Sequence, residues 1–374
     1  MPIFPEIPAF DEDAAARARR HQLSLTKPPG SLGRLEDLAV FYAGVRGQFP
    51  ATVPARAELF VFAADHGVAA EKVSAYPAEV TAAMVGNFLH GGAAVNVLAR
   101  QCGVSVTVVD VGVGGSAAPR SELAPAARQS DGPSFVSARV ASGTRNLRRE
   151  AALTAAEAEA ALSVGLSMAA AAASRGADLL VGGDMGIANT TAAAALVCAI
   201  CDEDPAGIVG RGTGVDDEGL ARKIEVIRDA LALHRALLDG PAGRAFGALQ
   251  AVGGLEIAAL AGLMIGGAAR RLPVIVDGFI ASAAALVACR LVPAVRSFLV
   301  LSHLSAERGA HRLAKLLGGP PPLIDLGLRL GEGTGATLVV PLLRAAVALQ
   351  NQMATFAGAG VPEGAPALAT APTE

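Results

Sequence analysis

The sequence predicts an α/β protein built on a doubly wound, mostly parallel Rossmann-like sheet with helices on both faces. Short runs rich in valine, leucine and isoleucine repeatedly lead into a turn of glycine, aspartate, histidine or serine, and then into an alanine- and leucine-rich stretch. Because these apolar runs are largely uninterrupted by polar residues, we expect strands buried on both faces, as in a parallel sheet covered by helices.

The composition is consistent with a large core. The chain has 374 residues, of which 52% are hydrophobic and 17% charged, enough for one large domain or two smaller ones. Aromatic residues make up only 4%, whereas there are 43 glycines. Small aliphatic side chains are therefore expected to do the packing, with backbones that approach closely.

Six segments follow the strand–turn–helix pattern, and ligands of such folds bind beyond the carboxyl ends of the strands. The last segment puts Glu332 at such an end, and the polar stretch 112–145 is expected to be a long loop. The six segments are ELFVFAADHG (58–67), VSVTVVDVGVGG (104–115), ADLLVGGDMGIANTT (177–191), LPVIVDGFIAS (272–282), RSFLVLSHLSAERG (296–309) and PLIDLGLRLGEGTGA (322–336).

The two ends of the chain are expected to form a small helical subdomain. Residues 1–45 contain two helix candidates separated by a Pro-Gly turn, and 336–356 form a last helix. The large α/β domain then spans 46–335. The Pro-, Ala- and Gly-rich tail 357–374 is expected to be disordered.

Several function classes are disfavoured. A net charge of −3 gives no electrostatic case for nucleic acid or an anionic membrane. The apolar stretch 251–269 contains Glu256 and is expected to be a buried helix, and the N-terminus has no signal-peptide pattern, which favours the cytoplasm. Cys198 and Cys201 have CxxC spacing without a second pair, so free thiols are expected rather than a metal site.

Two glycine-rich loops are candidate phosphate sites. In GGDMGIANTT (182–191), Asn189 and Thr190 stand where a helix should start, so free backbone N–H groups and the helix dipole would favour an anion. In GRGTGVDDEGLARK (210–223), a Gly-Thr-Gly turn precedes a helix that carries Lys223. Ordinary glycine turns with capped helix starts remain the alternative for both. Neither is a Walker A loop.

Other loops give weaker signals. VGVGGS (111–116) lacks the spacing of a dinucleotide fingerprint, and no serine-hydrolase G-x-S-x-G motif occurs. Asp277 stands at a strand end, where a helix cap is its simplest role. Glu332 is flanked by glycines that would admit a ligand. Its carboxylate could be a partly desolvated general base or the N-cap of the next helix.

The loops together resemble the nicotinate-nucleotide–dimethylbenzimidazole phosphoribosyltransferase family. The blocks that carry the resemblance run in family order from about residue 20 to residue 345. They are KPPGSLGRLEDLA, AADHGVAAEKVSAYPAEVTAAMV, GGDMGIANTT, GRGTGVDDEGLARK, VDGFIASAA, SHLSAERG and LRLGEGTGA.

The resemblance implies transfer of a phosphoribosyl group from nicotinate mononucleotide to 5,6-dimethylbenzimidazole. The products are α-ribazole 5′-phosphate and nicotinate, formed with inversion at the anomeric carbon. The family's catalytic glutamate falls on Glu332. The family also implies a homodimer, with no cofactor and no metal.

The remaining implied site residues bind substrate. The phosphate cradle maps onto Gly186, Ile187, Asn189, Thr190, Gly212 and Gly214, helped by Lys223 and Ser305. Tyr76 is the candidate for stacking on the base, and Leu330 and Gly331 complete the set. The chain departs from the family at Asp184, where a glutamate near the glycosidic bond is common, and at Ala188, where a glycine is common.

Two other functions stay open at this stage. One is a nucleotide-binding regulator without catalytic activity on the same fold, which the intact Glu332 loop disfavours. The other is a nicotinamide-dinucleotide oxidoreductase, which the poor glycine fingerprint at 111–116 disfavours.

Overall fold

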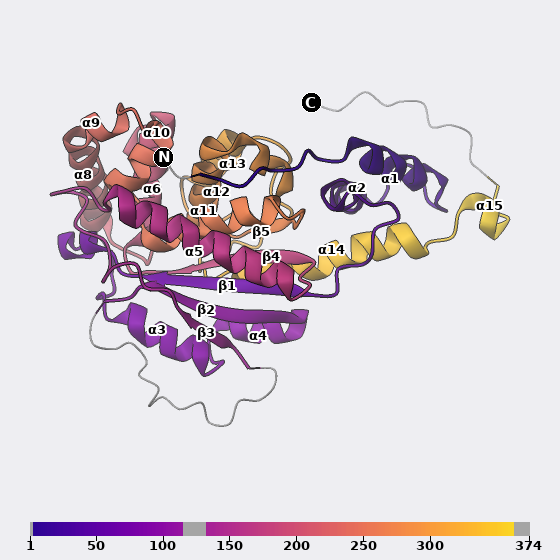
Figure 1. The fold of residues 1–374 in the computed structure, drawn as a ribbon, viewed down its shortest axis with the longest axis horizontal. Helices are drawn as coiled ribbons and strands as arrows, with labels where there is room; N and C mark the ends of the chain where they lie inside the picture. The colour runs from indigo at the N-terminus through magenta and orange to yellow at the C-terminus, as the bar shows by residue number, and fades with distance from the viewer. Residues whose placement is uncertain (1–2, 115–131, 363–374) are drawn as a thin grey trace. The chain divides into compact units, whose positions relative to one another are not determined.

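The computed structural model describes residues 3–114 and 132–362, and its larger unit contains a six-stranded, wholly parallel sheet (Figure 1). The strand order is β3-β2-β1-β4-β5-β6. The first strand therefore lies near the middle of the sheet, with β2 and β3 added on one side and β4, β5 and β6 on the other. The strands are β1 (Ala57–Ala64), β2 (Val104–Gly112), β3 (Ser134–Ser137), β4 (Leu179–Met185), β5 (Val274–Val276) and β6 (Leu299–Leu301). The α/β fold class predicted from the sequence is confirmed.

Helices cover both faces of this sheet, and two adjacent glycines of β4 show how closely. A Cβ at Gly182 would lie 2.7 Å from Leu260 on α11, whereas a Cβ at Gly183 would lie 2.6 Å from the carbonyl carbon of Glu332. Successive residues of a strand point to opposite faces. The helix α11 and the Glu332 turn therefore approach β4 from opposite sides, where no side chain would fit.

The helices of the larger unit follow the strands in the expected alternation. In Figure 1, α3 and α4 lie on the opposite side of the sheet from α5. The helices are α3 (Val80–Leu89), α4 (Ala94–Cys102), α5 (Ala155–Ser174), α6 (Asn189–Cys201), α7 (Pro205–Ile208), α8 (Asp217–Leu233), α9 (Arg235–Leu238), α10 (Arg244–Val252), α11 (Leu255–Ala268), α12 (Phe279–Leu291) and α13 (Ala310–Leu317), with 3-10 turns at Gly67–Glu71 and Pro293–Phe298.

Two sequence-based assignments were wrong. The segment 322–336 is no strand: it makes one isolated bridge, between Ile324 and His303, and then turns away at Gly327, whose φ is +65°. Conversely, the predicted loop 112–145 contains β3, which pairs with β2. Sequence reasoning missed β3 because it is a four-residue, incompletely buried edge strand without an apolar run.

The smaller compact unit comprises residues 9–55 and 340–374, and the larger comprises 1–8 and 56–339. Within the smaller unit, α1 (Glu12–Ser24) packs on α2 (Arg34–Arg46). The buried Gln22 donates a 3.0 Å hydrogen bond to Gln350 on α14 (Thr334–Gln352). The division into 1–45 with 336–356 and 46–335 remains our proposal for the functional domains. The predicted tail, 357–374, lies mostly outside the described residues, which end shortly after α15 (Phe356–Ala359).

Two apolar stretches bear on membrane association. Every residue of α11 is buried, as expected for 251–269. One stretch, Val80–Cys102, is long and apolar enough to cross a membrane by length and composition. It is nevertheless divided into α3 and α4 by a turn in which Gly91 has a φ of +75°.

Candidate active site

Glu332 lies in a tight turn just before α14. It has a φ of +63° and stands between Gly331 at +84° and Gly333 at +86°. The left-handed conformation costs a residue with a side chain about 1–2 kcal/mol. Such strain in a non-glycine residue is common at functional sites. The Glu332 side chain is directed inward, since the residue is only 5% exposed.

The α14 helix start is capped by Asp277 and not by Glu332. The Asp277 carboxylate, directly after β5, accepts hydrogen bonds from Gly333 N at 3.2 Å and Ala336 N at 2.9 Å. Thr334 closes the same turn through a 2.8 Å hydrogen bond to the carbonyl of Gly331. The expected capping role at this position thus belongs to Asp277, and the Glu332 carboxylate is left for another purpose.

Burial raises the pKa of Glu332 to about 7. A backbone hydrogen bond from Val95, in the first turn of α4, opposes this rise, and the negative charge of Asp277 contributes to it. Oxygen Oε2 of Glu332 is buried without a hydrogen-bond partner among the described residues. A carboxylate with a pKa near neutrality can accept a proton in the working pH range and release it again.

Asp184 lies next to this turn, near the end of β4. A Cβ on Gly331 would be only 3.1 Å from its Oδ2, which accepts a 3.0 Å hydrogen bond from Asn189. Burial raises the pKa of Asp184 well above its usual value, and the charges of Asp277, Glu256 and Glu332 add to the effect. Three other carboxylates at this end of the sheet therefore disfavour the ionisation of Asp184. The described residues hold no acid or histidine cluster arranged to bind a metal ion.

The two predicted phosphate loops meet through Lys223. Its Nζ donates a 3.0 Å hydrogen bond to Thr190 Oγ1, and a Cβ on Gly212 would lie 3.0 Å from the same nitrogen. Lys223 is 1% exposed, and burial lowers its pKa to about 8 although the charge of Glu307 raises it. The buried ammonium thus hydrogen-bonds a hydroxyl rather than a carboxylate, and the charge of Glu307 only partly offsets the cost of burial.

The α6 helix start differs from the expected cap. The N-cap residue is Ala188, with a φ of +74°, and no side chain caps the helix. Asn189 instead hydrogen-bonds Asp184, and Ile187 N donates to Thr81 Oγ1 at 3.1 Å. Ala188 therefore adopts a conformation that favours glycine, the residue expected there from the family. The α8 start is an ordinary cap, in which Asp216 accepts from Gly219 N.

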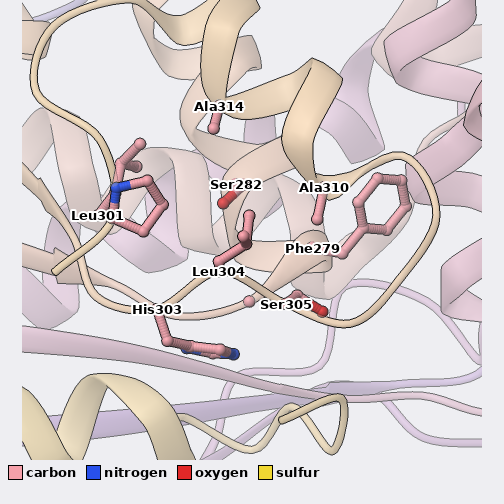
Figure 2. A pocket seen from close by; sticks show the side chains of 10 residues that line it. Phe279, Ser282, Leu301, His303, Leu304, Ser305, Ala310 and Ala314 are labelled. Carbon is pink, nitrogen blue, oxygen red and sulfur yellow. The ribbon is translucent and has the colours of Figure 1, made fainter. Parts of the chain in front are cut away.

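Ser305 belongs to a segment that packs against the Gly210–Gly214 loop. Ser305 is buried and accepts a 3.3 Å hydrogen bond from Glu307 N. Figure 2 shows it with His303, Ser282 and Phe279 around a cavity of about 10 Å³, room for about one water. A Cβ on Gly210 would overlap the Glu307 carboxylate, which places this segment against the Gly210–Gly214 loop.

Two of the predicted substrate-binding residues, including the candidate for stacking on the base, are at the surface. Tyr76 is 55% exposed and Leu330 56% exposed. The Tyr76 segment is joined to the other glycine loop, because Thr213 Oγ1 accepts a 3.0 Å hydrogen bond from Ala75 N. The structure thus connects the segment expected at the base to the loop expected at the phosphate.

One buried pair was not among the predicted site residues. His66, just after β1, shares a 2.6 Å hydrogen bond with Glu256 in the first turn of α11. Two separate signals are present in the sequence: His66 stands in the DHG turn, and Glu256 is a lone acid in an apolar segment. Nothing in the sequence connects two residues 190 positions apart.

Comparison with known proteins decides the family. A family model described as a phosphoribosyltransferase matches residues 7–361. Proteins named nicotinate-nucleotide–dimethylbenzimidazole phosphoribosyltransferase are close relatives. One from Salinispora tropica is 50% identical, covering 94% of this chain and 96% of its own.

The chain belongs to this phosphoribosyltransferase family. A second relative of the same name, from Solidesulfovibrio magneticus, is 50% identical over 97% of this chain and 98% of its own. The crystal structure of CobT from Thermus thermophilus superposes with a TM-score of 0.85 at 45% identity, covering 94% of this chain and all of that one. The resemblance noted in the sequence is confirmed, and the family's catalytic activity is favoured over the regulator alternative.

The raised pKa of Glu332 predicts a pH-dependent stability difference between the wild type and Glu332→Gln. The unfolded glutamate ionises near 4.5, whereas the folded one holds its proton to about 7. Burial of this carboxyl therefore costs no ionisation energy below pH 4.5, and the wild type loses stability as the pH rises from 4.5 to 7. The Tm of Glu332→Gln should exceed that of the wild type by about 3 °C or more at pH 8, and by less at pH 5.

Thermal unfolding followed by circular dichroism at both pH values measures this difference. Glu218→Gln, at an exposed acid of α8, is the matched control. A Glu332→Gln advantage of equal size at both pH values would contradict the buried, raised-pKa carboxyl.

Proposed function

We propose that this protein transfers the phosphoribosyl group of nicotinate mononucleotide to 5,6-dimethylbenzimidazole, giving α-ribazole 5′-phosphate and nicotinate with inversion at C1′. The names of its close relatives support the reaction. The observation that carries the proposal is the Glu332 carboxyl. It is buried, is not the helix cap, has a pKa near 7 and keeps Oε2 without a partner among the described residues.

The chemistry needs one base. As the C1′–N bond of the nucleotide breaks, its electron pair goes to the ring nitrogen, and the pyridinium leaves as neutral-ring nicotinate. One azole nitrogen attacks C1′ from the opposite face. The other azole nitrogen then carries a proton that must leave, and Glu332 accepts it. A positioned base of this kind contributes about 10²–10⁴-fold.

The neighbouring acids suit the charge that develops on the sugar. The ribosyl carbon becomes cationic as nicotinate departs, and preorganised acceptor oxygens in a water-poor site stabilise such a charge. Asp184 adjoins the Glu332 turn, and one of its oxygens, Oδ1, is buried without a partner in the described part of the chain. We propose that Asp184 faces the glycosidic region, as the family suggests.

The phosphate of the donor is proposed to bind where Thr190, Gly212 and Lys223 meet. A dianion there would offset the burial of the Lys223 charge more fully than Glu307 does. Gly186 and Gly214 are proposed to line the same site, with Ser305 at its edge. Tyr76, Leu330 and Gly331 are proposed to contact the base.

The direct test is an assay with a Glu332→Gln variant. Wild-type protein mixed with both substrates should release nicotinate and form ribazole phosphate, followed by chromatography. Glu332→Gln should lower kcat by about 10²-fold or more while it still binds the nucleotide, because only the proton acceptor is lost. The wild-type kcat/KM should rise with pH through about 7, since the base must be ionised.

Two outcomes would contradict the proposed reaction or the proposed role of Glu332. The reaction is wrong if nicotinate release by the wild type does not depend on the azole. Glu332 is not the base if its glutamine variant keeps near-normal turnover.

The phosphate site predicts a selective effect of Lys223→Met. The methionine keeps most of the buried stem but removes the charge, so affinity for nicotinate mononucleotide should fall about 10-fold or more. Affinity for the nicotinate riboside, which lacks the phosphate, should change little. Calorimetric titration measures both, with Lys315→Met at an exposed lysine of α13 as the matched control. Equal losses for nucleotide and riboside would show that Lys223 does not bind the phosphate.

We propose that the enzyme acts in the cytoplasm on small molecules, as a homodimer, with no nucleic-acid or membrane partner. The family supports the dimer, and the net charge of −3 is consistent with the absence of anionic partners. Sedimentation at micromolar concentration should give twice the chain mass, 37.4 kDa for one copy. A monomer across that range would contradict the dimer.

A further inference from the structure

The His66–Glu256 pair lies beneath the predicted phosphate loop and has no part in the mechanism above. Both side chains are fully buried, and His66 Nε2 lies 2.6 Å from Glu256 Oε1. Short hydrogen bonds to an ionised carboxylate are among the strongest in proteins. The start of α11 also favours a negative charge at Glu256.

The imidazole fills the space between two backbone turns. A Cβ on Gly186 would lie 3.2 Å from His66 Cδ2 and Nε2, and a Cβ on Gly254 would lie 2.6 Å from His66 Cε1. Gly186 begins the 186–190 turn after β4, and Gly254 precedes α11. The ring therefore sets the distance between the predicted phosphate turn and the start of α11.

The 186–190 turn is held from two directions. Thr81, on α3, accepts a hydrogen bond from Ile187 N at 3.1 Å. His66 packs against Gly186, whose Cβ position is also only 2.6 Å from the carbonyl oxygen of Ala64. A small displacement of this turn would move the Asn189 side chain, which hydrogen-bonds Asp184. It would also move Thr190, which accepts a hydrogen bond from Lys223.

The pair carries an evident cost. His66 Nδ1 and Glu256 Oε2 are both buried without a hydrogen-bond partner among the residues described. Buried polar atoms without partners destabilise a fold, as does a desolvated charge. A pair retained for stability alone would be expected to satisfy these atoms, so the arrangement points to a role in the site.

We propose that His66 and Glu256 are a positioning pair for nucleotide binding. Glu256 fixes the orientation of the His66 ring. The ring holds the 186–190 turn at a set distance from the start of α11, and this placement is what phosphate binding and the Asn189–Asp184 hydrogen bond require. This inference rests on the proposed function. It adds two positioning residues that touch neither the phosphate nor the base.

The test compares substitutions at both residues by titration with nicotinate mononucleotide and by steady-state kinetics. His66→Ala should raise the Kd for the nucleotide about 10-fold or more and leave the KM for dimethylbenzimidazole within about twofold. His66→Gln, whose amide can still donate to Glu256, should recover the nucleotide Kd to within about threefold of the wild type.

Glu256→Gln separates placement from charge and keeps the test decisive if His66→Ala does not fold. Its amide oxygen accepts the same imidazole hydrogen bond in the same shape, so the nucleotide Kd should stay within about threefold of the wild type. A loss of about 10-fold would overturn the proposal, because charge and not placement would then be what matters.

His234→Ala is the matched control. His234, at the end of α8, is also a buried histidine. Its Nε2 lies 2.8 Å from the carbonyl oxygen of Leu147. It should lower Tm without changing the nucleotide Kd. An unchanged nucleotide Kd in His66→Ala, or equal weakening of both substrates, would overturn the positioning role. If instead the wild type neither binds nor converts the nucleotide, the proposed function itself fails.

Discussion

The burial of four carboxylates at one end of a parallel sheet is the constraint on which this structure depends. Asp184 stands near the end of β4 and Asp277 directly after β5, while Glu256 lies in the first turn of α11 and Glu332 precedes α14. Burial raises the pKa of Asp184, and the charges of the other three acids raise it as well. The fold holds these acids together through close backbone contacts, such as those at Gly183 and Gly331.

The four acids divide by how their oxygens are used. Both oxygens of Asp277 accept backbone hydrogen bonds at the start of α14, so this residue builds the site. Asp184, Glu256 and Glu332 each keep one buried oxygen without a partner in the described residues. Unsatisfied buried acceptors are costly and uncommon. Their concentration around one turn fits a site shaped for a cationic sugar and a departing proton, at the expense of stability.

Sequence patterns could predict the fold class and the positions of the loops because both depend on short, contiguous stretches of residues. Uninterrupted apolar runs identified five of the six strands, and glycine-rich turns marked the loops around Gly186, Gly212 and Glu332. The pattern failed where local and tertiary signals differ. The alternation in 322–336 looked like a strand, but Leu326 and Leu330 are exposed and no neighbouring strand pairs with most of it. The short edge strand β3 carried too little apolar sequence to be seen.

The sequence by itself determined that this chain is a parallel α/β protein of a phosphoribosyltransferase family, and that a single glutamate stands among glycines. Only the tertiary structure decided what that glutamate is free to do. Residue Asp277, 55 positions earlier in the chain, takes the cap, and Gly183 lets the turn come close enough to bury the carboxylate. The same holds for the pair of His66 and Glu256. Burial and proximity depend on which distant segments pack together, and this is not visible in any local stretch of residues.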